Sequence, residues 1–150
     1  MQKPSKINVK AFCVFRYETR ILVFEGFDSL ENLLFYRPLG GSVEPGETSQ
    51  KAIEREIREE LGEEIENVEL LGVLEEIFTH EGLPGHEVIF IYDAEFIDKR
   101  VYGKPLMVAK ESDGTSLNVA WKNLDFFNGD HRLVPVELKA LLESKSVQED

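Results

Sequence analysis

The sequence predicts an α/β fold with a mixed β-sheet, and three observations lead to this prediction. Short runs rich in β-branched and aromatic residues, which are typical of strands, lie before, between and after two segments with helical spacing of apolar residues. The chain has 150 residues, the size of one domain. No linker, internal repeat or low-complexity tract divides it, so we expect residues 1–150 to form a single domain with a buried core.

Strands are expected over residues 7–17, 20–24, 33–36, 68–78, 88–92 and 117–121. The first two are separated by a two-residue polar break and are expected to pair with each other. The pair Gly40-Gly41 is expected to form a turn after the third strand. Residues 99–113 are expected to form a loop, and a closing helix is expected over residues 135–142 with Pro135 in its first turn.

The most regular segment is a helix expected over residues 49–61. Thr48 is suited to cap its start, and Gly62 stands where a left-handed residue commonly ends a helix. Apolar residues recur at every fourth position and form one narrow stripe: Ile53, Ile57 and Leu61. This stripe is expected to pack on the core.

The charge of the chain restricts the classes of partner. Seventeen lysines and arginines stand against 29 aspartates and glutamates, which gives a formal net charge of −12. Such a charge argues against binding a nucleic acid duplex or an anionic membrane, and a polyanionic substrate would need bridging cations. The single cysteine, Cys13, has no internal partner for a disulfide. Without an apolar secretion signal or a membrane-spanning stretch, a soluble cytoplasmic protein is expected.

Three glutamates of the expected helix fall close together beside its apolar stripe. At about 100° per residue, Glu56, Glu59 and Glu60 lie within an arc of about 100° at the border of the buried face. Like charges three or four residues apart destabilise an isolated helix by about a few tenths of a kcal/mol per pair. Most glutamate-rich helices are nevertheless plain solvated faces, so the helix alone does not establish a site.

The double glycine before the helix favours a metal site over a solvated face. Gly40 and Gly41 let the backbone approach a ligand closely, and backbone carbonyls together with carboxylates are the oxygen ligands of hard cations. Such ligands suit Mg²⁺ or Mn²⁺ rather than zinc. The sequence therefore predicts a divalent cation beside Glu56, Glu59 and Glu60.

The same residues resemble a known family signature, the Nudix box G-x5-E-x7-R-E-U-x-E-E-x-G-U, in which U is a bulky aliphatic residue. Every fixed position up to the last is matched by Gly41, Glu47 and the run Arg55-Glu56-Ile57-Arg58-Glu59-Glu60-Leu61-Gly62. The one departure is Glu63 at the final aliphatic position, and Ile65 is expected to supply that packing. The box covers residues 41–63, and the resemblance implies a Nudix-type α/β/α sandwich with a mixed β-sheet.

The resemblance also implies hydrolysis of a phosphoanhydride bond. The substrate would be a nucleoside diphosphate linked to another group, attacked by water with Mg²⁺ or Mn²⁺ bound. By position in the box, Glu56, Glu59 and Glu60 are the metal-binding and catalytic carboxylates, and Gly40 matches a residue whose backbone carbonyl binds metal. Arg55 completes the catalytic set and is expected to orient a neighbouring carboxylate by a two-point contact.

Candidate substrate-binding residues lie outside the box. Arg37, just before the double glycine, could meet phosphate or simply end a surface strand. His86 lies in the segment 80–87, which could touch phosphate or form a plain polar hairpin loop. Glu111 could be the extra acid that many Nudix enzymes bring from outside the box. Glu47, within the box, is expected to brace its loop.

Two functions from different classes stay open at this point. The first is a Nudix pyrophosphohydrolase that acts on a small nucleotide-type molecule, as a monomer or a homodimer. The second is a Nudix-like nucleotide-binding or regulatory domain without turnover. Arg55, Glu56, Glu59 and Glu60 are all intact, which favours the enzyme. The sequence does not name the nucleotide.

Overall fold

The computed structural model of the chain describes residues 3–148, and side chains as far as residue 145. Its strands are β1 (Asn8–Val14), β2 (Arg16–Tyr17), β3 (Arg20–Asp28), β4 (Leu33–Arg37), β5 (Leu39–Ser42), β6 (Ile65–His80), β7 (Leu83–Phe96), β8 (Leu106–Lys110), β9 (Ser116–Asn123) and β10 (Arg132–Leu133). Its helices are α1 (Ser49–Leu61) and α2 (Leu138–Gln148), with short 3₁₀ helices η1 (Lys99–Gly103) and η2 (Leu124–Asn128).

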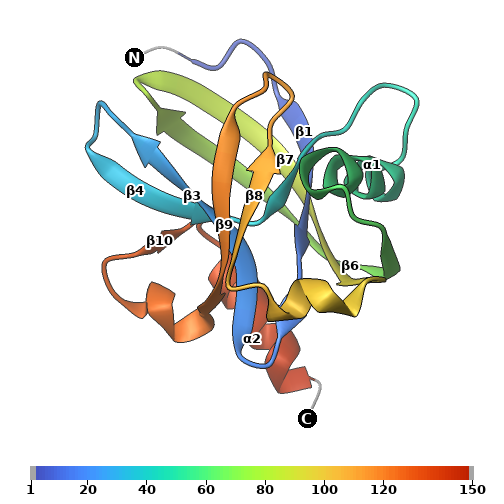
Figure 1. Cartoon of the computed structure of the whole chain (residues 1–150). Coiled ribbons are helices and arrows are strands. Elements are labelled where there is room, and N and C mark those ends of the chain that lie inside the picture. The colour runs from blue at the N-terminus through green and yellow to red at the C-terminus, as the bar shows by residue number, and fades with distance from the viewer. Residues whose placement is uncertain (1–2, 149–150) are drawn as a thin grey trace.

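The strands form two mixed sheets (Figure 1). The first has the order β5-β1-β7-β6, with β1 parallel to β7. The second has the order β10-β4-β3-β9-β8, with β10 parallel to β4, while β2 pairs with β3. The expected pairing of the first two strands is therefore wrong except at Arg16 and Tyr17. The end of β1 is buried on both faces because Ala11 and Cys13 pack in one core cluster and Phe12 and Val14 pack in the other.

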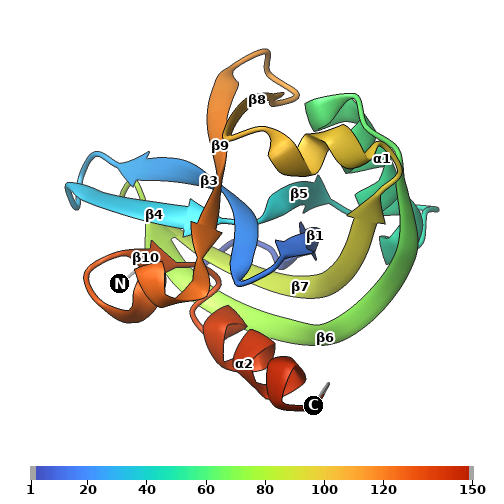
Figure 2. The same cartoon turned by 60° about the horizontal axis from the view of Figure 1, so that its bottom comes forward.

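Helices α1 and α2 cover opposite faces of the first sheet (Figure 2). Alternate residues of β1 point to opposite faces. Ala11 belongs to the core cluster that contains Ile53 and Ile57 of α1, whereas Phe12 belongs to the cluster that contains Leu142 of α2. This arrangement confirms the expected α/β/α sandwich.

Helix α1 occupies the expected residues because both of its ends are capped locally. The Thr48 hydroxyl accepts a hydrogen bond from the Lys51 N–H at 3.2 Å. At the other end, Gly62 has a φ of 70° and donates its N–H to the Arg58 carbonyl at 2.9 Å. Ile65 packs against the core just beyond this cap, as expected.

The double glycine lies in a strand and not in the expected turn. Gly40 and Gly41 belong to β5 and stand opposite Phe12 and Ala11 of β1. Gly40 has a φ of 145°, and a Cβ atom there would lie 2.0 Å from the Ala11 carbonyl oxygen. Glycine is therefore required for β5 to approach β1 this closely.

Two further expectations along the chain are wrong. Residues 99–113 form η1 and β8 rather than a loop; β8 pairs with β9, and its Leu106 and Val108 are exposed, which weakens the strand signal. The closing helix starts at Leu138 and runs to Gln148, so Pro135 precedes it, in a cis peptide bond with Val134.

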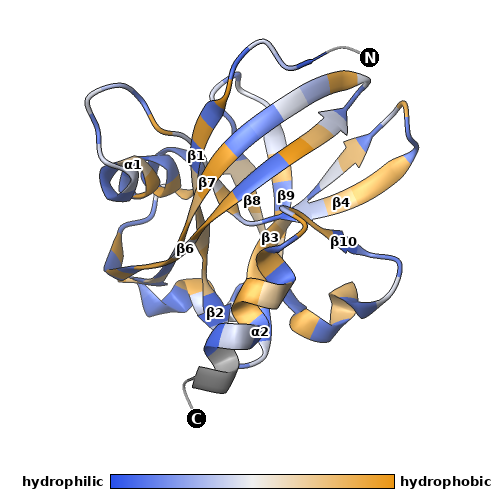
Figure 3. Ribbon diagram, turned by 180° about the vertical axis from the view of Figure 1, so that it is seen from behind, coloured by the Kyte–Doolittle hydropathy of each residue, from blue (hydrophilic) through white to orange (hydrophobic). Residues whose placement is uncertain are grey.

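Figure 3, seen from behind, shows hydrophobic and hydrophilic bands along β6 and β7. In β7 the run from Val88 to Ile91 is continuously apolar, and its Ile89 and Ile91 are fully buried. In residues 3–148, no helix is long and apolar enough to cross a membrane.

Removal of packing under α1 should show how far the site helix depends on the core. Ile57 is fully buried, so Ile57→Ala is expected to lower the free energy of unfolding by about 2–5 kcal/mol. Ile77 is 71% exposed on β6, and Ile77→Ala should cost less than about 1 kcal/mol. Urea unfolding of both variants checks this, and equal losses would contradict the burial described here.

Candidate active site

A cleft of about 810 Å³ runs along the box residues and the inner faces of both sheets. This volume lies within the usual range for ligand pockets. One end is lined by Gly40 and Gly41 of β5 and by Arg55, Glu56 and Glu59 of α1. The other end is lined by residues of the β3–β4 and β6–β7 hairpins.

Arg55 connects the loop before α1 to the acidic strip of the helix. Its Nε and Nη2 donate to the two oxygens of Glu47 at 3.0 and 2.6 Å. Its Nη1 donates to Glu56 at 3.1 Å and to Glu59 at 3.2 Å. Nη2 also reaches the Ser42 carbonyl at 3.0 Å. One planar guanidinium therefore positions a strand end, a loop and two carboxylates.

The two-point contact expected of Arg55 is made with Glu47, whereas Glu56 and Glu59 each receive one hydrogen bond from Arg55. Glu47 also accepts a hydrogen bond from the Glu44 N–H at 2.8 Å, so it braces the loop and anchors Arg55. The Arg55 guanidinium is the main cause that lowers the pKa of Glu47 to about 2. Glu47 is therefore a carboxylate that stays charged in the folded protein.

Glu56 lies directly against the backbone of β5. A Cβ atom on Gly41 would lie 2.5 Å from the Glu56 Cδ, so a residue with a side chain at position 41 would displace this carboxylate. Burial raises the pKa of Glu56, and the nearby Arg55 charge opposes that rise. The second glycine of the pair therefore makes room for a carboxylate.

Glu60 is a buried carboxylate whose charge is only partly compensated. Its side chain is 4% exposed, and neither carboxylate oxygen has a hydrogen-bond partner among the described residues. Burial raises the pKa of Glu60 to about 8, with a further contribution from Glu111 and an opposing one from Arg37. A buried, unpaired charge is strongly unfavourable. The position is therefore suited to a cation or to a proton.

The structure brings two of the three predicted substrate-binding residues to the cleft. Arg37 lies against the rings of Phe12 and Phe24, 4.6 and 4.5 Å from their centroids. Burial lowers the pKa of Arg37, and the charges of Glu60 and Glu111 oppose this change. Glu111 follows β8 and lines the cleft.

The third residue, His86, does not line the cleft. It lies within β7 because the strands of this hairpin extend to His80 and Leu83, so the expected loop over residues 80–87 is reduced to a tight turn. Its Nε2 lies 3.2 Å from a Glu75 oxygen on the neighbouring strand.

His80 and Glu87 line the cleft and belong to the segment 80–87, for which contact with phosphate was one of the two expectations. Other cleft residues had no prediction of a site role, namely Asp28, Phe35, Glu76 and Phe78. Glu76 and Glu87 are directly opposite each other on β6 and β7. Burial is the main cause that raises the pKa of Glu76. The only signal for this set is strand alternation, which identifies a shared face but not the sheet that faces it.

The carboxylates of Glu56, Glu59 and Glu60 and the carbonyl of Gly40 are suitable ligands for a hard divalent cation, although they are not arranged as a complete coordination shell. Across residues 3–148, no three His, Cys, Asp or Glu side chains are gathered as a metal centre. Arg55 engages Glu56 and Glu59, while Glu60 lacks a partner. Carboxylate oxygens beside a close glycine backbone are the chemistry that Mg²⁺ and Mn²⁺ prefer.

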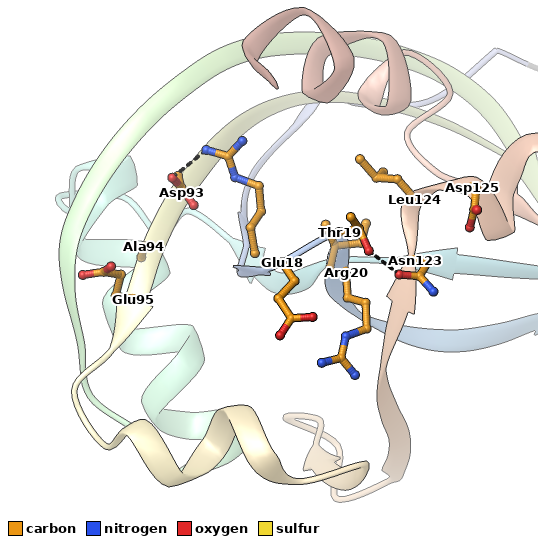
Figure 4. A pocket seen from close by; sticks show the side chains of 11 residues that line it. Glu18, Thr19, Arg20, Asp93, Ala94, Glu95, Asn123, Leu124 and Asp125 are labelled. Atoms are coloured by element: carbon orange, nitrogen blue, oxygen red, sulfur yellow. Dashed lines mark hydrogen bonds and ion pairs between the residues drawn. The ribbon is translucent and has the colours of Figure 1, made fainter. Parts of the chain in front are cut away.

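A second hollow, of about 720 Å³, lies between the β2–β3 turn and the ends of β7 and β9 (Figure 4). Two pairs of its polar side chains bond to each other: Arg16 pairs with Asp93 at 2.8 Å, and Thr19 donates to Asn123 at 2.6 Å. No box residue is among the described residues that line it. The first cleft is therefore the candidate active site.

Comparison with known proteins agrees with this geometry. The chain matches the NUDIX domain family over residues 4–125. Solved structures with a similar fold include a NUDIX hydrolase from Nitrosomonas europaea (TM-score 0.66, 20% identity, covering 95% of this chain and 90% of that one). A MutT NUDIX hydrolase from Burkholderia pseudomallei has a TM-score of 0.58 and 25% identity, covering 81% of this chain and 86% of that one.

A MutT protein from Methanosarcina mazei Go1 has a TM-score of 0.65 and 18% identity, covering 100% of this chain and 99% of that one. A search of curated proteins gave no match. The family match spans most of the chain, and the box residues build one end of the cleft. The chain therefore belongs to the NUDIX domain family.

Proposed function

We propose that this enzyme hydrolyses the diphosphate bond of a nucleoside diphosphate linked to another group, with Mg²⁺ or Mn²⁺ bound. One observation carries the proposal: Glu60 is buried and unpartnered next to Glu56 and Glu59, which Arg55 holds at the same end of the cleft. Three carboxylates beside a polyanionic substrate require positive charge from outside the chain. A divalent cation supplies it and activates water.

The residues divide the remaining tasks between them. Glu56, Glu59 and Glu60, with the Gly40 carbonyl, would hold the cation. Arg55 orients Glu56 and Glu59, and it is itself fixed by Glu47. The cleft therefore offers an acidic end for the cation and the diphosphate.

The rest of the cleft supports a nucleotide as the substrate. Arg37 lies in the cleft between the acidic end and the hairpins, where a guanidinium can meet a phosphate oxygen. Further along, the lining is aromatic, with Phe24, Phe35 and Phe78 among its residues. Aromatic side chains bind nucleobases by stacking and do so with little dependence on the base. The same lining would serve the alternative, a nucleotide-binding domain without turnover.

A hydrolysis screen separates these two functions. With nucleoside triphosphates, dinucleoside polyphosphates and nucleotide sugars as substrates, we expect phosphate or pyrophosphate release with Mg²⁺ or Mn²⁺. Little release is expected with Ca²⁺, which accepts looser geometry than Mg²⁺. Hydrolysis that persists undiminished in excess EDTA would contradict the metal requirement. Nucleotide binding without any turnover would favour the alternative.

Two arginines on α1 provide a matched test of the site. Arg55→Lys removes the planar contacts to Glu47, Glu56 and Glu59, and a ligand misplaced by about 1 Å can lower the rate on the order of a hundredfold. We therefore expect a large loss of kcat with little change in Tm. Arg58 makes a two-point contact with Glu64 on the exposed side of the helix, so Arg58→Lys should change neither quantity. If both variants lose turnover equally, Arg55 is not part of the site.

The buried carboxylate predicts how stability without metal depends on pH. The pKa of Glu60 is about 8 in the folded protein, above about 4.3 in an unfolded chain. The folded state therefore binds the proton more tightly, and this contribution to stability is lost as pH rises from about 4.5 through 8.

Glu60→Gln removes that loss because the amide carries no charge. We therefore compare the free energies of unfolding of Glu60→Gln and the parent by urea unfolding in EDTA. The value for Glu60→Gln minus the value for the parent should be larger at pH 9 than at pH 5. Glu69→Gln, at an exposed position on β6, serves as the control and should follow the parent at both pH values. A parent-to-Glu60→Gln difference that is the same at pH 5 and pH 9 would contradict the prediction.

A further inference from the structure

The end of the cleft away from the box residues, here called the outer half, is lined by strand faces from both sheets. Because side chains alternate along a strand, every second residue shares a face. The cleft is lined in this way by Phe24, Gly26 and Asp28 on β3, and by Glu76, Phe78 and His80 on β6. Both faces end at hairpin tips that are far apart in the sequence.

Each face contributes a phenylalanine ring that lies across a glycine of the neighbouring strand. Phe35 stands opposite Gly26, and Phe78 stands opposite Gly85. A Cβ atom on Gly26 would lie 2.2 Å from the Phe35 Cζ, and one on Gly85 would lie 2.3 Å from the Phe78 Cζ. Neither glycine has a positive φ. The missing side chains of Gly26 and Gly85 therefore leave the space that the tips of the two rings occupy.

The tips of the two hairpins are joined through Asp28, which is almost fully buried. One of its oxygens accepts hydrogen bonds from the Leu30 and Glu31 N–H groups of its own turn, both at 3.0 Å. The other oxygen accepts from the Glu81 N–H of the opposite hairpin at 3.1 Å. The same oxygen lies 3.6 Å from Nδ1 of His80.

The β6–β7 hairpin also contacts the β3–β4 hairpin through the side chain of Glu81. The Glu81 carboxylate accepts hydrogen bonds from the Ser29 N–H, at 2.7 Å, and from the Ser29 hydroxyl. The His80 ring meets the Phe35 ring edge-on, with centroids 5.5 Å apart. The bridge formed by Asp28, Ser29, His80 and Glu81 therefore contacts one of the aromatic walls directly.

We propose that Phe35 and Phe78 form a slot for the planar base of the substrate, and that the bridge sets the width of this slot by fixing one hairpin against the other. Asp28 is a positioning residue in this account because it acts through Glu81 and His80. The proposal rests on the proposed function, since it assigns a nucleoside to the end of the cleft away from the box. Stacking depends on ring separation, so a loosened bridge weakens base binding first.

Asp28→Asn tests the bridge with little change in shape. Its amide oxygen can still accept from the Leu30 and Glu31 N–H groups, but its NH₂ group would face the Glu81 N–H as donor against donor. Glu81→Ala, on the exposed turn, removes the other half of the bridge and serves if Asp28→Asn does not fold. Asp98→Asn is the matched control, because Asp98 also caps a backbone N–H but lies at η1, outside the cleft.

The measurement is calorimetric binding of AMP, GMP, CMP and UMP, with inorganic pyrophosphate as the ligand that lacks a base, all in Mg²⁺. The Kd of the tightest nucleotide should rise about tenfold or more in Asp28→Asn, in Glu81→Ala and in Phe78→Leu. The Kd of pyrophosphate should stay at the parental value in each variant, and Asp98→Asn should match the parent for both ligands.

Equal weakening for both ligands would mean a general loosening of the fold and would overturn the proposal. Unchanged nucleotide binding in the bridge variants, or a parent that binds no nucleoside monophosphate, would overturn it as well. The binding measurement does not depend on turnover. If the screen finds no hydrolysis, the proposed function is refuted, but nucleotide binding by the variants can still be compared with that of the parent.

Discussion

The acidic end of the cleft depends on the hydrogen bonds of the Arg55 guanidinium. Arg55 donates to the helix carboxylates Glu56 and Glu59, to the loop residue Glu47 and to the Ser42 carbonyl. Without these hydrogen bonds, Glu56 and Glu59 would repel each other at one helical turn of separation. Glu47 fixes the orientation of the guanidinium by accepting two hydrogen bonds from it. Arg55 makes no hydrogen bond to Glu60, however, which leaves one buried carboxylate without a hydrogen-bond partner among the described residues. The chain therefore builds a site that is electrostatically incomplete on its own.

The fold serves this site through short-range backbone contacts. Gly40 allows β5 to lie close to β1, and Gly41 leaves the space that the Glu56 carboxylate fills. The apolar stripe of α1 then fixes the helix over β5 and β1, with Ile53 and Ile57 fully buried. Both the core under the helix and the glycines beside it thus determine where the carboxylates point. From there the cleft continues past Arg37 to aromatic walls that two different sheets provide.

The sequence predicts well what local chemistry determines. Helix α1 and its caps follow from residues within one or two turns, and the spacing of the box identifies Arg55 and its acids. The sequence predicts poorly the features that depend on residues far along the chain. Strand β1 was expected to pair with β3 but lies in the other sheet, and Gly40 and Gly41, which suggested a turn, lie in β5. The contact between the two hairpins was missed for the same reason, because Asp28 and Glu81 meet only when hairpins from separate sheets come together. His86 shows the converse error, since turn-forming neighbours suggested a loop where β7 continues.

The central claim is that Glu56 and Glu59 at the acidic end of the cleft, together with the buried Glu60 of the same helix, bind a divalent cation. Mn²⁺ binding followed by electron paramagnetic resonance tests this most directly, because the six-line signal of free Mn²⁺ falls as the ion binds. The account predicts that the parent protein depletes free Mn²⁺ at about stoichiometric concentrations and that Glu60→Gln leaves most of it free under the same conditions. Depletion of free Mn²⁺ by Glu60→Gln to the same extent as by the parent would contradict it.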